Sequence, residues 1–167
     1  STLRVDSIRG QTADGTNRYV VQVVNVQDGA VATTTGTVAY DDTIMQNDEG
    51  GEFMTLAITP TSATNKLKID VCFNGSANSG NKITTVGLFQ DSTADALAEA
   101  TVFVSITNSP HNVNFTHFMT AGTTSATTFK VRAGNDTSST LTFNGQNGSR
   151  KGGGRYASSM TITEISQ

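Results

Sequence analysis

The amino-acid sequence predicts an all-β domain. About ten short segments alternate apolar and polar residues, which is the two-residue period of a half-buried strand. Glycine, asparagine, aspartate and serine separate these segments every ~8 to 14 residues, a spacing typical of a β-sandwich, a jelly roll or a barrel. Threonine fills many of the remaining positions, and its β-branched side chain favours extended structure.

The first 17 residues differ from the rest of the chain. Leu3 and Val5 share one face of an extended segment, Ile8 is out of phase with them, and residues 10–17 are turn-rich. Such a segment cannot bury enough apolar surface by itself. We therefore expect a docking arm over residues 1–17, which rests on a neighbouring subunit or a larger assembly, and one domain over residues 18–167.

Several strands are expected in the first part of the domain. Residues 20–26 form a nearly continuous run of valines, typical of a strand covered on both faces. Residues 31–40 are threonine-rich and strand-like, and a short apolar pair, Ile44-Met45, precedes the loop at residues 47–51.

The stretch at residues 56–73 is expected to be central. Leu56 and Ile58 alternate with small residues, Pro60 begins a turn, and a second strand follows. In that second strand four apolar side chains share one face and three others the opposite face, so a slip of one residue would bury a lysine and an aspartate. We expect a hairpin here.

A similar phrase at residues 124–132 predicts either an equivalent entry from loop to strand or a duplicated half-barrel.

Further strands are expected at residues 82–89, 99–107, 112–120, 129–133, 140–144 and 159–165. The only segment with fair helix propensity, residues 91–99, is too short for an independent helix. Residues 145–156 form the most basic and glycine-rich loop.

The bulk composition excludes several classes of protein. With 35% hydrophobic and 15% charged residues, the 167-residue chain is long enough for one domain with a core. Its net charge of −3 argues against nucleic-acid binding. No apolar run approaches the ~20 residues of a membrane span. Because no charged-then-apolar signal-peptide pattern follows Ser1, we expect synthesis in the cytoplasm. The single Cys72 excludes an internal disulfide.

Motifs for catalysis, metals or cofactors are weak. Acidic residues such as Asp41 and Asp42 fall in predicted turns, without the order of a calcium loop. His111 and His117 have no metal-ligand spacing, and residues 150–155 lack the ending of a phosphate-binding loop. We expect no catalytic, cofactor or metal site. Loop residues that remain candidates for a ligand are Tyr40, Arg150, Lys151, Arg155 and Tyr156.

Four phrases in the chain resemble a known group of proteins. Residues 2–8 (TLRVDSI) are similar to the N-terminal phrase of tail-fibre-like and virion proteins of marine tailed bacteriophages. Residues 56–67, 118–131 and 159–165 resemble the hairpin, strand entry and ending of the same proteins. The resemblance spans nearly the whole chain. It implies a C1q/TNF-like jelly roll that assembles as a trimer, with a virion location and capsid or tail proteins as partners.

The resemblance also implies a function. Tail fibres carry a longer N-terminal part than this arm, which favours a small protein that decorates the capsid or forms a fibre tip. We expect Leu3, Val5 and Ile8 to anchor it, and Val21, Val23, Met160 and Ile162 to lie at the trimer interface. The alternative is a module that recognises a host surface glycan through distal loops, although the chain has no Trp and only three Tyr. An enzyme such as a capsule depolymerase is the weakest alternative, because the repeated β-helix turns are absent.

Overall fold

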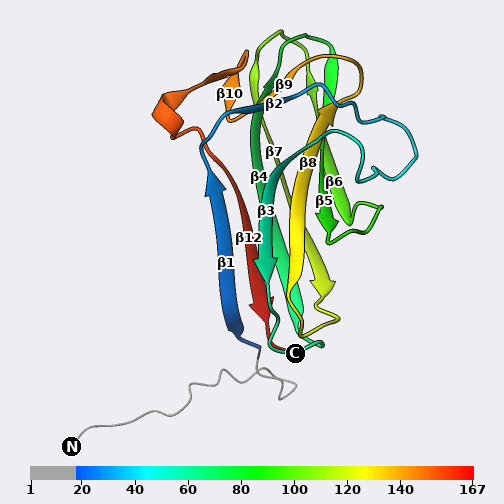
Figure 1. The fold of residues 1–167 in the computed structure, drawn as a ribbon, viewed down its shortest axis with the longest axis vertical. Helices are drawn as coiled ribbons and strands as arrows, with labels where there is room; N and C mark the ends of the chain where they lie inside the picture. Colours follow the sequence, from blue (N-terminus) through cyan, green and yellow to red (C-terminus); the bar gives the residue numbers. More distant parts are fainter. Residues whose placement is uncertain (1–17) are drawn as a thin grey trace, which may run out of the picture.

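The computed structural model describes residues 18–167, which form a sandwich of two antiparallel sheets (Figure 1). In sheet A, β1 (Val20–Asp28) pairs with β12 (Ser158–Ile165), and β12 pairs with β4 (Lys66–Ala77). Sheet A also contains β7 (Pro110–Thr120), β9 (Leu141–Phe143) and β2 (Ala32–Thr34). Sheet B has the order β3 (Gly51–Ile58), β8 (Thr127–Asn135), β5 (Lys82–Gln90) and β6 (Ala98–Val104). A small hairpin of β10 (Gly145–Gln146) and β11 (Ser149–Arg150) precedes a 3-10 turn, η1 (Gly152–Gly154).

The strand pairing is that of a jelly roll. Among the eight long strands the first pairs with the last, β1 with β12, and the second with the seventh, β3 with β8. The same nesting continues inward with β4 and β7 and then β5 and β6. Winding one long antiparallel hairpin into two sheets produces this pattern, which defines the double-sheet jelly roll. The predicted fold class is therefore confirmed.

One edge of β4 is shared by two strands. β12 pairs with β4 between Lys66 and Cys72, β9 pairs with it between Gly75 and Ala77, and β7 runs along the opposite edge. Polar side chains fill the gap between β12 and β9. Ser158 Oγ accepts a hydrogen bond from the Asn74 N–H (2.8 Å) and donates one to Asn144 Oδ1 (2.7 Å). Sheet A therefore stays continuous where two of its strands meet end to end.

The predicted hairpin at residues 56–73 is wrong. Its two strands exist, but β3 pairs with β8 in sheet B while β4 lies in sheet A. The connection at residues 59–65 is an arch between the sheets. A hairpin and an arch have the same turn composition, so only contacts with distant residues distinguish them.

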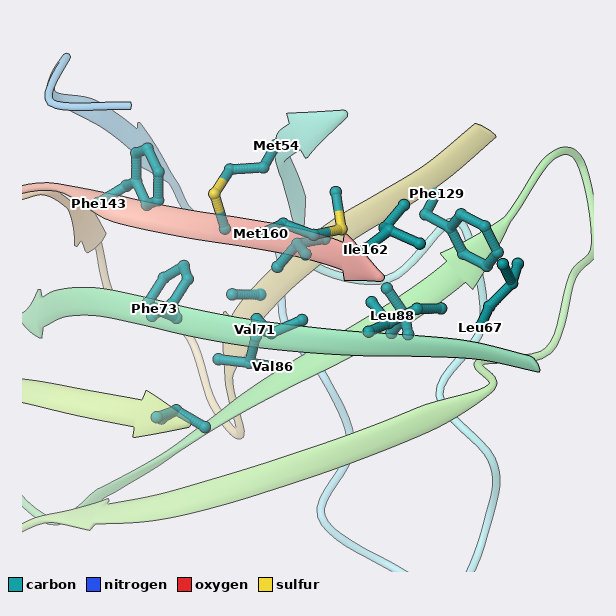
Figure 2. Close-up of a cluster of buried hydrophobic side chains, with 14 of the residues drawn as sticks. Met54, Leu67, Val71, Phe73, Val86, Leu88, Phe129, Phe143, Met160 and Ile162 are labelled. Atoms are coloured by element: carbon teal, nitrogen blue, oxygen red, sulfur yellow. The ribbon is translucent and has the colours of Figure 1, made fainter. Parts of the chain in front are cut away.

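The core fills the space between the sheets. The inward side chains of β4 are Leu67, Ile69, Val71 and Phe73, and each is at most 3% exposed. Phe73 lies 5.4 Å from the Phe143 ring centroid. Figure 2 shows this cluster together with Met160 and Ile162, which point from β12 into the same space. Burial of a side chain of this size contributes about 1.5–3 kcal/mol to stability.

A loop covers part of the outer face of sheet B. The connection between β2 and β3 carries Val38 and Met45, which pack with Phe89 of β5 in a second buried cluster. Gly87 allows this approach, because a Cβ atom there would lie 2.6 Å from Met45 Sδ. The apolar segment at Ile44-Met45 thus supplies one buried residue, Met45, and one exposed residue, Ile44.

A buried carboxylate fixes the arch. Glu164 of β12 is fully buried, and its oxygens accept hydrogen bonds from Gln22 Nε2 (2.6 Å), Asn65 Nδ2 (2.6 Å), and the Thr61 backbone N–H (2.8 Å) and hydroxyl (2.9 Å). Burial alone would raise the pKa of Glu164, but these four donors outweigh it and hold the pKa at about 2. The charged form therefore joins β1, β12 and the arch without a cationic partner among these contacts.

We predict that Glu164→Gln lowers the free energy of unfolding by about 2–3 kcal/mol, because the new amide group faces donors that the carboxylate accepted. Denaturant unfolding at neutral pH measures the change. The matched control is Glu99→Gln, on the exposed side of β6, which should change the stability by no more than about 0.5 kcal/mol. Equal effects of the two substitutions would contradict this role of Glu164.

The same network predicts a pH dependence. Because folding depresses the pKa of Glu164 from 4.5 to about 2, its stabilisation is present above pH 4.5 and is lost as the pH falls toward 2. The free energy of unfolding of the Glu164→Gln variant should not show this loss between pH 4.5 and pH 2. An unchanged difference in stability between the two proteins from pH 6 to pH 2 would count against the prediction.

Candidate interaction surface

Four strands of sheet A present a broad surface that faces away from the core. We call it the outer face, and the strand register arranges it in rows across β1, β12, β4 and β7. The side chains of three successive rows are Val23, Thr163, Lys68 and Phe118; Asn25, Thr161, Asp70 and Thr116; and Gln27, Ser159, Cys72 and Asn114. Directly paired residues lie on the same face of an antiparallel sheet, so each row is a line of neighbouring side chains.

Small side chains hollow the middle of the outer face. A shallow depression of about 300 Å³ is lined by side chains and backbone of Asp70, Val71, Cys72, Asn114, Phe115, Thr116, Ser159 and Thr161. The depression is open rather than a deep cleft, and its side chains are mostly short and uncharged. Its shape suits a side chain of another protein better than an enclosed small molecule.

The two charged groups in these three rows, Lys68 and Asp70, neutralise each other. Lys68 Nζ lies 2.5 Å from Asp70 Oδ2, and the Thr116 hydroxyl donates a hydrogen bond to Asp70 Oδ1 (2.6 Å). Burial would raise the pKa of Asp70, but Lys68 and Thr116 together lower it below the ordinary value. The Asn25 amide donates to Thr161 Oγ1 (2.8 Å) in the same row. These three rows are therefore polar without strong net charge, and Lys66 adds a positive charge at the end of the face where β1 begins.

Exposed apolar side chains lie at both margins of the outer face, at the end where β1 begins. Val23 is 56% exposed and Phe118 59% exposed, and Tyr19 and Val20 are similarly open. A hollow of about 480 Å³ lies beside Phe118, lined also by Arg18, Lys66, Met119, Ile165 and Gln167. Large apolar groups gathered on a surface mark interaction sites more often than isolated ones do.

The four predicted interface residues separate in the structure. Met160 and Ile162 are fully buried in the core, so their side chains do not reach a second subunit. The alternation of β12 instead places Ser159, Thr161 and Thr163 on the outer face. Val23 is exposed on that face, while Val21 is half-buried where the pairing of β1 with β12 shifts by one residue.

The predicted ligand-loop residues do not form one site. Tyr40 is exposed on the β2–β3 connection, whereas Arg150, Lys151 and Arg155 are exposed around η1, on the other side of the molecule in Figure 1. Tyr156 is half-buried, and its hydroxyl donates to the His111 carbonyl (3.4 Å). The predicted anchoring residues Leu3, Val5 and Ile8 lie outside the described residues.

The contacts of the candidate acid Asp41 and of the two histidines are with the protein's own residues. Asp41 Oδ1 accepts hydrogen bonds from the backbone N–H (2.8 Å) and hydroxyl (2.5 Å) of Thr43, which hold its pKa below the ordinary value. Burial lowers the pKa of His111 and of His117. In residues 18–167 no group of three or more His, Cys, Asp or Glu side chains could hold a metal ion. Over the same residues no helix is both long and apolar enough to cross a membrane.

Comparisons with known proteins add a distant structural similarity. No protein-family model matches the chain, and no curated protein matches it. The fold is similar to one chain in a structure of infectious bursal disease virus, Gt strain, with a TM-score of 0.38 and 8% sequence identity. The match covers 86% of this chain and 40% of that chain, so this chain spans less than half of its length. The jelly-roll assignment rests on the strand pairing described above.

Proposed function

We propose that the protein is a non-enzymatic structural protein of a bacteriophage virion, a trimeric jelly roll that decorates the capsid or forms a fibre tip. The observation that carries this proposal is the outer face of sheet A, a four-stranded surface with a shallow central hollow and exposed Val23 and Phe118 at one end. It offers area and shape for packing against protein rather than a deep site for chemistry.

The composition of the outer face suits contact between identical copies. Lys68 and Asp70 are already paired, so two such faces can approach without a large like-charge repulsion. The short hydroxyl side chains of β12 allow close approach of a neighbouring backbone or side chain. A closed ring of three copies buries such surfaces without open-ended growth.

Two further arguments support a virion location. The sequence resembles marine bacteriophage virion proteins in four separate phrases. The double-sheet jelly roll is also a common architecture of viral capsid domains. Because one fold serves many functions, the outer face carries the proposal and the fold supports it.

Residues 1–17 are assigned the attachment to neighbouring proteins of the particle. Deleting them should leave a folded protein with its oligomeric state intact, because residues 18–167 contain the whole described core. Binding to particles should be lost. Co-sedimentation of full-length and shortened protein with particles measures this, and circular dichroism provides the control for folding. Retained attachment of the shortened protein would refute the assignment.

A pair of threonine substitutions tests the interface. Thr161→Arg places a long charged side chain in the middle of the outer face, where it should break the trimer into single copies. The matched control is Thr101→Arg, at an exposed position of β6 in sheet B, which should leave the trimer intact. Both substitutions should change the stability of the single fold by about 0.5 kcal/mol or less. Light scattering after size-exclusion chromatography gives the mass. An intact Thr161→Arg trimer would exclude the outer face as the interface.

Recognition of a host surface glycan is the second candidate function. Arg150, Lys151 and Arg155 are exposed around η1, at the end of the sandwich opposite the start of β1 (Figure 1). They would face outward from a protein attached through its N-terminal arm. A glycan array probed with the full-length protein should then give signals that the triple substitution Arg150→Ala, Lys151→Ala, Arg155→Ala removes. Absence of any signal from the full-length protein would eliminate this candidate.

A further inference from the structure

The loop between β9 and β12 concentrates positive charge in a chain whose net charge is −3. Arg150, Lys151 and Arg155 lie within six consecutive residues, and no acidic residue occurs from residue 137 to residue 163. All three side chains are exposed, and within residues 18–167 none of them forms an ion pair or a side-chain hydrogen bond. Neighbouring cations without partners repel one another, so an anion between them would be favourable.

A polar hollow lies beside these cations. It has a volume of about 470 Å³, and its lining residues are Gln27, Gly29, Gly154, Arg155 and Ala157. The end of β1 supplies one wall and the loop after η1 supplies the other, and Figure 1 shows the two segments next to each other. The volume falls in the range of small-ligand sites, about 300–1,000 Å³. Its walls offer an amide, a guanidinium group and peptide groups.

Close backbone contacts place both arginines at this hollow. A Cβ atom on Gly29 would lie 2.2 Å from the Gly154 carbonyl oxygen, so only glycine allows this approach of β1 to the loop. Gly154 itself has a φ angle of +86°, which also favours glycine. A Cβ atom on Gly154 would lie 3.5 Å from Arg150 Nη1, so the Arg150 guanidinium borders a lining residue. Arg155 lines the hollow directly.

The acid nearest in the sequence leaves this charge uncompensated. Asp28 lies between Gln27 and Gly29, but it is half-buried and does not line the hollow. Its Oδ1 atom accepts a hydrogen bond from the Ala30 N–H (2.7 Å). The hollow therefore keeps two guanidinium groups for a ligand. A guanidinium group matches the two oxygens of a carboxylate or a sulfate with parallel hydrogen bonds.

We propose that this hollow binds an acidic saccharide through its carboxylate or sulfate group. Arg155 and Arg150 hold the anionic group, while the Gln27 amide and the peptide groups of Gly29 and Gly154 are available to the sugar hydroxyls. A single inorganic anion would fill only a small part of the hollow. Single-stranded nucleic acid is a poorer match, because no aromatic side chain among the lining residues offers a face for base stacking.

The saccharide in this inference rests on the second candidate function, whereas the anionic charge of the ligand follows from the loop itself. All lining residues come from one chain, so binding does not require the trimer. A protein that proves to be a single copy and still binds an acidic saccharide would refute the trimer and leave this site in place.

Calorimetric titration of the full-length protein with defined oligosaccharides tests the proposal. The acidic probes are trigalacturonate and sulfated maltotriose, and their neutral counterparts are methyl-esterified trigalacturonate and maltotriose. An acidic probe should bind about tenfold more tightly than its neutral counterpart, because it adds charge-assisted hydrogen bonds. The preference should weaken at high salt, which screens exposed charges.

Substitutions locate the site. Arg155→Gln and Arg150→Gln should each weaken binding of the acidic probes by about tenfold. Arg155→Lys keeps the charge but loses the planar fork, so its affinity should lie between those of the native protein and Arg155→Gln. The matched control is Arg18→Gln, which removes the same charge from an exposed position at the other end of the sandwich and should leave the affinity unchanged.

Each other outcome overturns the proposal. Equal binding of acidic and neutral probes, unchanged by the arginine substitutions, would refute the anionic site while glycan recognition stands. Inorganic sulfate that binds as tightly as the acidic probes would indicate a site for free anions. Tighter binding of a single-stranded oligonucleotide would assign the loop to nucleic acid. An equal loss in Arg18→Gln would indicate only general attraction, and absence of binding by both acidic probes would refute the site outright.

Discussion

The register of β4 is the constraint on which the rest of the structure depends. Its inward side chains from Leu67 to Phe73 are buried in the core, while Lys68, Asp70 and Cys72 face outward. Because β4 pairs with β12 and β9 on one edge and with β7 on the other, its alternation sets the facing of every neighbouring side chain. A slip of one residue would bury a lysine and an aspartate and expose four apolar side chains, at a cost comparable with the whole stability of a domain.

Polar networks fix sheet A at both ends. Near the chain termini, Glu164 joins β1 and β12 to the arch at residues 59–65. At the opposite end, Ser158 links Asn74 of β4 to Asn144 where β12 gives way to β9. Between these two networks the inward side chains of the sheet pack into the core. Its outer face is therefore a defined surface whose side-chain positions follow from the same register.

Local alternation predicted most of the strands but not their partners. The two-residue period identified β7 and β12 within two residues at each end, and it identified the start of β4 but ended that strand four residues early, at Phe73 instead of Ala77. It did not show that β3 and β4 belong to different sheets, because the arch depends on Glu164, about a hundred residues away in the sequence. The cover of sheet B by Met45 was missed for a similar reason. The apolar pair Ile44-Met45 did not show what Met45 packs against, and Gly87, whose missing side chain makes room for the thioether, is distant in the sequence.

The candidate interface was predicted less well than the fold. Alternation in β12 grouped Met160 with Ile162 correctly, yet an apolar face suits a core and a subunit interface equally well. Only the packing of the two sheets decides between these, and it assigns that face to the core. The valine run in β1 was expected to be covered on both faces, whereas Val23 is exposed in the single chain. That difference is what a surface completed by another copy would produce.

The central claim is that the outer face of sheet A joins identical copies of the chain. The most direct test is the mass of the full-length protein in solution, measured by light scattering over a wide range of protein concentration. The account predicts three times the 17.5 kDa mass of one chain, held down to low concentration. A mass of one chain at every concentration would contradict it.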